Sequence, residues 1–285
     1  MTAVATRFGN TSSAMRQDRP LTNDQLFRLA PSIFAVEKHE SRSARYTYIP
    51  TIEVIDGLRK EGFMPFTASQ GKSRIEGKTE FTKHLIRFRK ESNILKPIAN
   101  EIVLINSHDG TSTYRMVSGL IRFVCMNGMI TGDIVEDIKV FHKGDIVDNV
   151  VEGAFRIMDG FELANESMER MKQIPMSVRE QEAFAKAALS LKYDKGEIEE
   201  GQWRESSAPI LPNQLLAVKR QEDRSSDLWT KFNVVQENLI RGGQSGRSAS
   251  GRRATTRAVN SIDGNVKLNR ALWILADEMA KIKAC

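Results

Sequence analysis

The sequence predicts an α+β protein, with a mixed, mainly antiparallel sheet and helices in the N-terminal half and a helical C-terminal half. Short β-rich runs recur up to residue 142, and two of them flank an Asp-Gly turn. From residue 145 onward, apolar residues recur at helical spacing. We therefore divide the chain into a mixed α/β region at 1–144 and a helical region at 145–285.

The composition is that of a globular protein. Of 285 residues, 40% are hydrophobic and 27% are charged, which suffices for a buried core. No apolar run approaches the roughly 18 residues needed to cross a bilayer. Residues 1–18 lack the apolar middle region of a secretion signal. We expect a cytoplasmic protein without a membrane partner. With only Cys125 and Cys285, no disulfide framework is expected, and Cys125 is interpreted as a buried thiol.

The chain begins with helices and strands in alternation. Two helices are expected, each with a polar cap at its start and a helix-breaking residue at its end: 23–29 with Thr22 and Pro31, and 51–61 with Thr51 and Gly62. Strands are expected at 46–49, 63–69 and 83–89.

The expected strand at 83–89 has an alternating pattern. Its two faces are Lys83, Leu85, Arg87 and Arg89 on one side, and His84, Ile86 and Phe88 on the other. Such a strand is expected to present cations to solvent and apolar side chains to a core.

A hairpin is predicted at 101–118. The β-rich runs at 101–105 and 113–117 flank Asn106-Ser-His-Asp-Gly110, and Asp-Gly favours a hairpin turn with Asp109 and Gly110 at its tip. Ser107, His108 and Asp109 are adjacent in sequence, but neighbouring residues point in different directions and do not build a triad. A helix is then expected at 119–126 and a strand at 137–142.

The C-terminal half reads as a series of helices. They are expected at 145–172, 177–191, 228–240 and 267–282, with a polar loop at 196–212. Ser177 and Glu180 form a capping-box pattern at the start of the second of these helices.

The strongest functional signal is the Arg/Gly/Ser-rich loop at 241–257. It holds five arginines and no acid in a chain of net charge +6. Guanidinium groups match phosphate oxygens, and serine hydroxyls add donors. The candidate nucleic-acid-binding residues here are Arg241, Arg247, Ser248, Ser250, Arg252, Arg253 and Arg257. The alternative is a flexible solvated linker. The Gly-x-x-x-x-Gly-Lys-Ser/Thr pattern of a P-loop is absent.

A second basic segment lies at 78–96, which contains six Lys or Arg residues and only two glutamates. Lys83, Arg87 and Arg89 are the candidates there, since cations on one face of a strand beside phenylalanines can follow a sugar-phosphate backbone. A solvated strand face is the alternative. The four histidines, His39, His84, His108 and His142, lack metal-ligand spacing, so no metal or other cofactor and no catalytic residue is expected.

Several motifs resemble a family of uncharacterised proteins carried by prophages and plasmids, a domain of unknown function. They are Pro31-Ser-Ile-Phe34, the run 41–51, Asn106-Ser-His-Asp-Gly-Thr-Ser112, Arg122-Phe-Val-Cys-Met-Asn-Gly128, Asp227-Leu-Trp229, the run 242–253 and the run 268–273. The resemblance covers nearly the whole chain. It implies a mobile-element setting, often near anti-restriction genes, and supplies no catalytic residues. The chain also has a remote likeness to phage single-strand annealing proteins, which place a sheet and a helix along a basic groove, often in rings.

The sequence thus favours a non-catalytic nucleic-acid-binding protein of mobile genetic elements that holds DNA, in particular single-stranded DNA, through the two basic segments. Two alternatives remain open. One is a host-interaction protein that counters a defence system through a direct protein partner. The other is a metal-dependent nuclease using His108 and Asp109. Homo-oligomerisation also remains open.

Overall fold

The computed structural model describes residues 19–41, 48, 50–73, 75, 77–90, 98–112, 114–123, 127–131, 138–140, 146–194, 207–248 and 250–284, with the strand backbones at 4–5 and 15–16. The chain forms two compact units. Unit 1 comprises Met1–Leu163 with Asn260–Asp263, and unit 2 comprises Ala164–Val259 with Gly264–Cys285. Each unit is described by itself.

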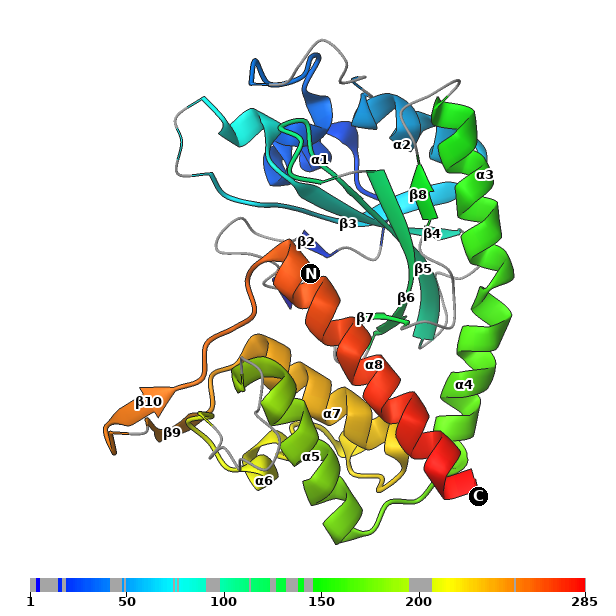
Figure 1. Cartoon of the computed structure of the whole chain (residues 1–285). Coiled ribbons are helices and arrows are strands. Elements are labelled where there is room, and N and C mark those ends of the chain that lie inside the picture. The colour runs from blue at the N-terminus through cyan, green and yellow to red at the C-terminus, as the bar shows by residue number, and fades with distance from the viewer. Residues whose placement is uncertain are drawn as a thin grey trace, which may run out of the picture. The chain divides into compact units, whose positions relative to one another are not determined.

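An antiparallel sheet forms the centre of unit 1 (Figure 1). Its strands, in spatial order, are β3 (Phe63–Gln70), β4 (His84–Lys90), β5 (Ile98–Asn106), β6 (Tyr114–Arg122) and β7 (Asn127–Ile130), and β8 (Ile138–Val140) pairs with β6 beside β7. A separate two-stranded sheet joins β1 (Val4–Ala5) and β2 (Met15–Arg16). The predicted α+β class, with a mainly antiparallel sheet in the N-terminal half, is confirmed.

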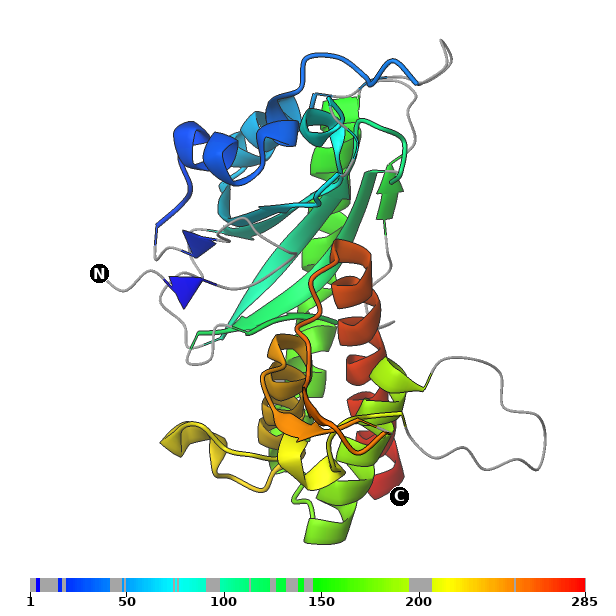
Figure 2. The same cartoon turned by 90° about the vertical axis from the view of Figure 1, so that its left-hand side faces the viewer.

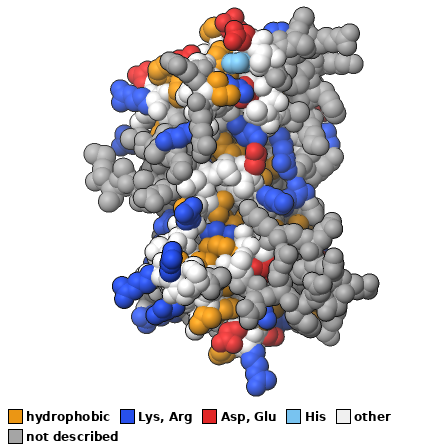
Figure 3. Space-filling view, turned by 60° about the vertical axis from the view of Figure 1, so that its left-hand side comes forward, with side chains coloured by type: hydrophobic (Ala, Val, Ile, Leu, Met, Phe, Trp, Pro, Cys, Tyr) orange, Lys and Arg blue, Asp and Glu red, His pale blue; other side chains and the backbone are white. Residues whose placement is uncertain are grey.

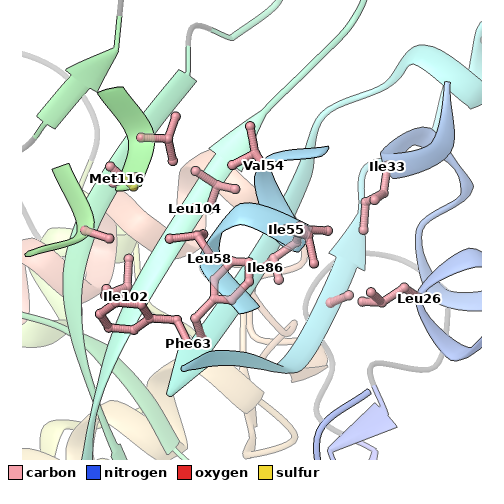
Figure 4. Packing of buried hydrophobic residues seen from close by; sticks show 14 of the residues in the cluster. Leu26, Ile33, Val54, Ile55, Leu58, Phe63, Ile86, Ile102, Leu104 and Met116 are labelled. Atoms are coloured by element: carbon pink, nitrogen blue, oxygen red, sulfur yellow. The ribbon is translucent and has the colours of Figure 1, made fainter. Parts of the chain in front are cut away.

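Helices cover one face of the sheet and enclose the core of unit 1. They are α1 (Asn23–Leu29), the short 3₁₀ helix η1 (Pro31–Phe34), α2 (Thr51–Lys60) and α3 (Ile146–Asp159). Leu26, Ile55 and Leu58 point inward from the helices, and Ile86 and Ile102 from the strands (Figure 4). Each such side chain contributes about 1.5–3 kcal/mol when it is fully buried. The core therefore fixes which face of β4 and β5 is apolar.

The turn between β5 and β6 closes the predicted hairpin. β5 and β6 pair antiparallel, with Ile105 opposite Arg115. Gly110 has φ 74°, the left-handed conformation that glycine adopts without strain. The Asp109 carboxylate accepts hydrogen bonds from the N–H and hydroxyl of Thr111 at 3.0 and 2.6 Å. The Asp-Gly signal thus identified the hairpin correctly.

Two local predictions in unit 1 are wrong. Of the helix expected at 119–126, residues 119–122 are instead the end of β6, because Gly119 and its neighbours are hydrogen-bonded to strands on both sides. A Cβ on Gly119 would lie 2.9 Å from the Met129 carbonyl oxygen, so this close strand approach needs glycine. The second wrong prediction is that Thr51 caps the helix expected at 51–61. Thr51 is instead the first residue of α2, after the N-cap Pro50, and its side chain is buried.

Some predictions lie outside the described residues. They concern Cys125, Cys285 and most of the strand expected at 46–49. None of the helices in the described ranges is both long enough and apolar enough to span a bilayer.

Helices dominate unit 2 (Figure 2). They are most of α4 (Phe161–Gln173), α5 (Val178–Tyr193), α6 (Pro212–Leu215), α7 (Leu228–Arg241) and most of α8 (Ile262–Ala284). Helix α4 follows α3 in the chain after a break at Gly160, and a short 3₁₀ helix, η4 (Gln221–Asp223), precedes α7. Trp229 and Phe232 of α7 meet the ring of Trp273 in α8 edge to face, with centroids 6.2 and 5.9 Å apart. The predicted capping box of Ser177 and Glu180 starts α5. The helical C-terminal half is therefore confirmed.

Candidate nucleic-acid interface

The Arg/Gly/Ser-rich segment between α7 and α8 contains a short β-hairpin. Strands β9 (Ser245–Arg247) and β10 (Arg253–Thr255) pair antiparallel, with Arg247 directly opposite Arg253. At the tip, the Ser248 N–H donates to the Arg252 carbonyl at 2.9 Å and the Gly251 N–H donates to the Ser248 carbonyl at 2.8 Å. We call residues 245–255 the arginine hairpin. Within unit 2, it projects away from the helices (Figure 1).

The first strand of the arginine hairpin is fixed to the segment before α6. The Arg247 N–H donates to the Pro209 carbonyl at 2.7 Å. The Gln214 side-chain amide donates to the Ser245 carbonyl at 2.8 Å. A Cβ on Gly246 would overlap the Pro209 carbonyl oxygen, so only glycine permits this approach. The base of the hairpin is therefore held against the rest of unit 2.

The chain entering and leaving the hairpin is fixed as well. The Gly243 N–H donates to the Thr256 carbonyl at 2.8 Å. Lys192 of α5 donates from Nζ to the carbonyls of Leu239 and Arg257, both at 2.7 Å, and burial lowers the pKa of its ammonium group to about 8. The sequence left open that residues 241–257 are a flexible solvated linker. The base of the arginine hairpin is instead held by these hydrogen bonds.

Four of the predicted arginines are exposed. They are Arg247, Arg252, Arg253 and Arg257. No carboxylate among the described residues forms an ion pair with any of them. Arg247 donates from Nη1 to the Gly251 carbonyl at 3.1 Å, which supports the tip and leaves other guanidinium donors available. In the view of Figure 3, more Lys and Arg side chains than Asp and Glu side chains are visible.

The register brings two like charges together. Arg247 and Arg253 are opposite residues on one face of the ribbon. Opposite residues have Cβ atoms about 4.5–5.5 Å apart, and like charges at that spacing are destabilising by roughly 0.2–1 kcal/mol. An anion between the two guanidinium groups would remove that repulsion and accept hydrogen bonds from both.

The remaining predicted residues of this segment have internal partners. Arg241 pairs with Glu237 at 3.0 Å, and Arg220 donates twice to the same carboxylate at 2.7 and 2.9 Å. Burial would raise the pKa of Glu237, but these hydrogen bonds and charges lower it below its ordinary value. Ser248 and Ser250 lie at the tip, with their hydroxyl oxygens 3.0 Å apart. The Arg241 guanidinium is therefore engaged in an ion pair within the last turn of α7.

The second basic segment is not an open cationic surface. Arg87 and Arg89 are 0% and 2% exposed and share the buried Glu101, with N–O distances of 2.7 and 2.8 Å. The Arg89 guanidinium also lies over the ring of Phe66, 4.5 Å from its centroid. The expectation that this strand presents Arg87 and Arg89 to solvent is wrong, because Glu101 on the adjacent strand neutralises charge inside the protein. Lys83 is bound to Asp263 of the same unit at 2.7 Å.

A buried polar cluster lies beneath the β5–β6 turn, and the sequence did not reveal it. Thr51 Oγ1 is 3.0 Å from His84 Nε2, 3.3 Å from His108 Nε2, 3.1 Å from Asn106 Nδ2 and 3.0 Å from the Tyr114 hydroxyl. One hydroxyl has three hydrogen-bonding positions, so the longest contact, to His108, is the weakest of the four. The only sequence signal was Thr51, a polar residue at the start of a helix.

Both histidines of this cluster are neutral at pH 7. Burial lowers the pKa of His108 to about 4 and that of His84 well below its usual value. Ser107 bonds its hydroxyl to the backbone of Ser112, and Asp109 closes the turn. These hydrogen bonds give Ser107 and Asp109 a structural role in the β5–β6 turn. Within the described ranges there is no group of three His, Cys, Asp or Glu side chains that could hold a metal ion.

The fold and the site define an α+β protein that carries an ordered basic hairpin on a helical unit. The chain belongs to the family of the "Domain of unknown function (DUF932)", whose model matches residues 38–273. It is similar to UPF0380 protein YafZ and UPF0380 protein YfjQ of Escherichia coli (strain K12). Each is 47% identical over 279 residues, covering 98% of both chains. No solved structure matches. The family resemblance identified from the motifs is thus confirmed.

Proposed function

We propose that this protein is a non-catalytic nucleic-acid-binding protein that contacts DNA through the arginine hairpin. The observation that carries the proposal is the opposed, exposed pair of Arg247 and Arg253 on a fixed base, without a carboxylate partner among the described residues. Arg252 and Arg257 extend the positive charge beyond the pair. Such a row of cations suits a polyanion, because each phosphate it neutralises releases a counterion.

Salt dependence of binding tests this proposal. We expect the logarithm of the association constant to fall with the logarithm of salt concentration by about 0.9 for each neutralised phosphate of a duplex. The double variant Arg247→Gln/Arg253→Gln should lower that slope by about 1.8 if each arginine makes one contact. Fluorescence anisotropy of labelled oligonucleotides between about 50 and 200 mM salt measures the slope.

A matched control removes the same charge elsewhere in unit 2. Arg179 and Lys186 are exposed on α5, and Arg179→Gln/Lys186→Gln should leave the slope nearly unchanged. Absence of binding to every oligonucleotide, or equal effects of the two double variants, would refute the proposal.

The motifs shared with proteins of prophages and plasmids lead us to propose mobile genetic elements as the setting and the cytoplasm as the compartment. A protein partner, such as a host defence protein, is the second candidate. Phe27 and Val36 of unit 1 are 56% and 87% exposed, and such apolar side chains favour a protein contact. Co-purification before and after nuclease digestion separates the two, since only a protein-bound partner survives digestion. We do not propose a nuclease, because His108 is buried and Asp109 is engaged in the turn.

A further inference from the structure

We infer that the arginine hairpin enters the major groove of duplex DNA. The inference rests on the proposed function and names the form of nucleic acid that the hairpin recognises. It replaces the single-stranded ligand expected from the sequence. Three features of the hairpin support it: its dimensions, the distribution of its charges, and the residues that it lacks.

The hairpin has the dimensions of a groove-binding ribbon. The major groove of B-DNA is about 12 Å wide and about 8.5 Å deep and admits a two-stranded β-ribbon. The segment beyond the anchor to Pro209 runs from Arg247 to the tip at Ser250. Because the chain already turns between Ser248 and Gly251, the ribbon extends only about 7 Å beyond the anchor at roughly 3.3 Å per residue, somewhat less than the depth of the groove. The long arginine side chains extend further than the backbone. The minor groove, about 6 Å wide, is too narrow for two strands roughly 4.8 Å apart with their side chains.

The charges of the hairpin lie on both faces of the ribbon. Arg247 and Arg253 share one face because they are paired residues. Arg252 precedes Arg253, and the Ser248–Arg252 hydrogen bond extends the pairing to this residue, so its side chain leaves from the other face. A groove is bounded by a phosphate strand on each side, whereas a single strand offers one. Cations on both faces therefore match a duplex.

The hairpin lacks the groups that hold single strands. Proteins that bind single-stranded nucleic acid without sequence preference combine cations with aromatic side chains on which bases stack. Residues 241–257 include no Phe, Tyr or Trp. Stacking contributes about 1–3 kcal/mol per base, and an arginine hairpin without aromatic residues forgoes it. Phosphate contacts remain, and a duplex presents them at twice the density along its axis.

Competition and groove blocking test the inference on the full-length protein. The ligands are a labelled duplex of two to three helical turns, one of its strands alone, and the same duplex with glucosylated 5-hydroxymethylcytosines that fill the major groove. Netropsin serves as a minor-groove competitor. We expect at least about tenfold tighter binding to the duplex than to the strand, loss of binding on glucosylation, and little displacement by netropsin.

Variants connect the result to the hairpin. At about 0.1 M salt each phosphate contact contributes a factor of about 8, so Arg247→Gln/Arg253→Gln should weaken duplex binding on the order of 60-fold. Arg247→Lys/Arg253→Lys keeps the charge and should keep the salt slope. Circular dichroism verifies that each variant is folded.

Each outcome has one meaning. Equal or tighter binding of the single strand, with both ligands weakened by the glutamine variant, overturns the groove inference and leaves the proposed function standing. Displacement by netropsin, or undiminished binding to the glucosylated duplex, also overturns the inference. Failure of every nucleic acid to bind removes the proposed function together with it.

Discussion

Replacement of Glu101 by glutamine tests the account of the buried cations in unit 1. The Glu101 carboxylate is 0% exposed and joins Arg87 and Arg89 at 2.7 and 2.8 Å. Glutamine has nearly the same shape but no charge, and its NH₂ group would face a guanidinium donor. Removing one partner of a buried ion pair destabilises a protein by about 3–5 kcal/mol. We expect Glu101→Gln to lower the free energy of unfolding by that amount.

Urea denaturation followed by two signals locates the effect. The three tryptophans, Trp203, Trp229 and Trp273, all belong to unit 2, so their fluorescence reports on unit 2. Far-ultraviolet circular dichroism reports on both units. With a denaturant dependence of about 2 kcal/mol per molar urea, a loss of about 4 kcal/mol shifts the midpoint by about 2 M. A shift in circular dichroism without one in fluorescence places the loss in unit 1.

The control is an exposed ion pair of the same unit. Asp56 pairs with Arg59 one turn along α2 at 2.9 Å, and its side chain is half exposed. Asp56→Asn should change the free energy of unfolding by about 0.5 kcal/mol or less. If Glu101→Gln proves no more harmful than Asp56→Asn, the reasoning that the carboxylate neutralises buried cations is refuted.

Two further predictions concern the buried histidine and the base of the hairpin. The pKa of His108 is about 4 in the fold and 6.5 as the ordinary value, so its neutral form stabilises the protein fully above pH 6.5 and this stability is lost as pH falls toward 4. The loss is about 3 kcal/mol, and a flatter pH profile for His108→Gln in urea denaturation checks it. Gly246→Ala should displace the hairpin from Pro209 and weaken duplex binding without changing the charge. The control Gly251→Asn, at an open tip position with φ 75°, should leave the affinity unchanged in the anisotropy assay. Equal affinities of the two variants for the duplex would contradict the anchoring.

The sequence determined the features that depend on neighbours a few residues away. Thr22 and Ser177 cap their helices through bonds to residues three positions on. Asp109 and Gly110 close a hairpin in the same local way. These signals identified the class of the fold and most of its elements. The motifs identified the family, and the run 241–257 identified the segment with exposed cations.

Tertiary structure decided which polar groups are buried and which cations remain available. Arg87 and Arg89 read as a solvated face, yet Glu101 pairs with both from an adjacent strand. Gly119 read as the start of a helix until strand pairing on both sides fixed it as sheet. Arg247 and Arg253 became an opposed pair only through the register of a hairpin that Pro209 anchors. The physical reason is common to all three: alternation along a strand gives each side chain its face, but the pairing of strands determines what that face meets.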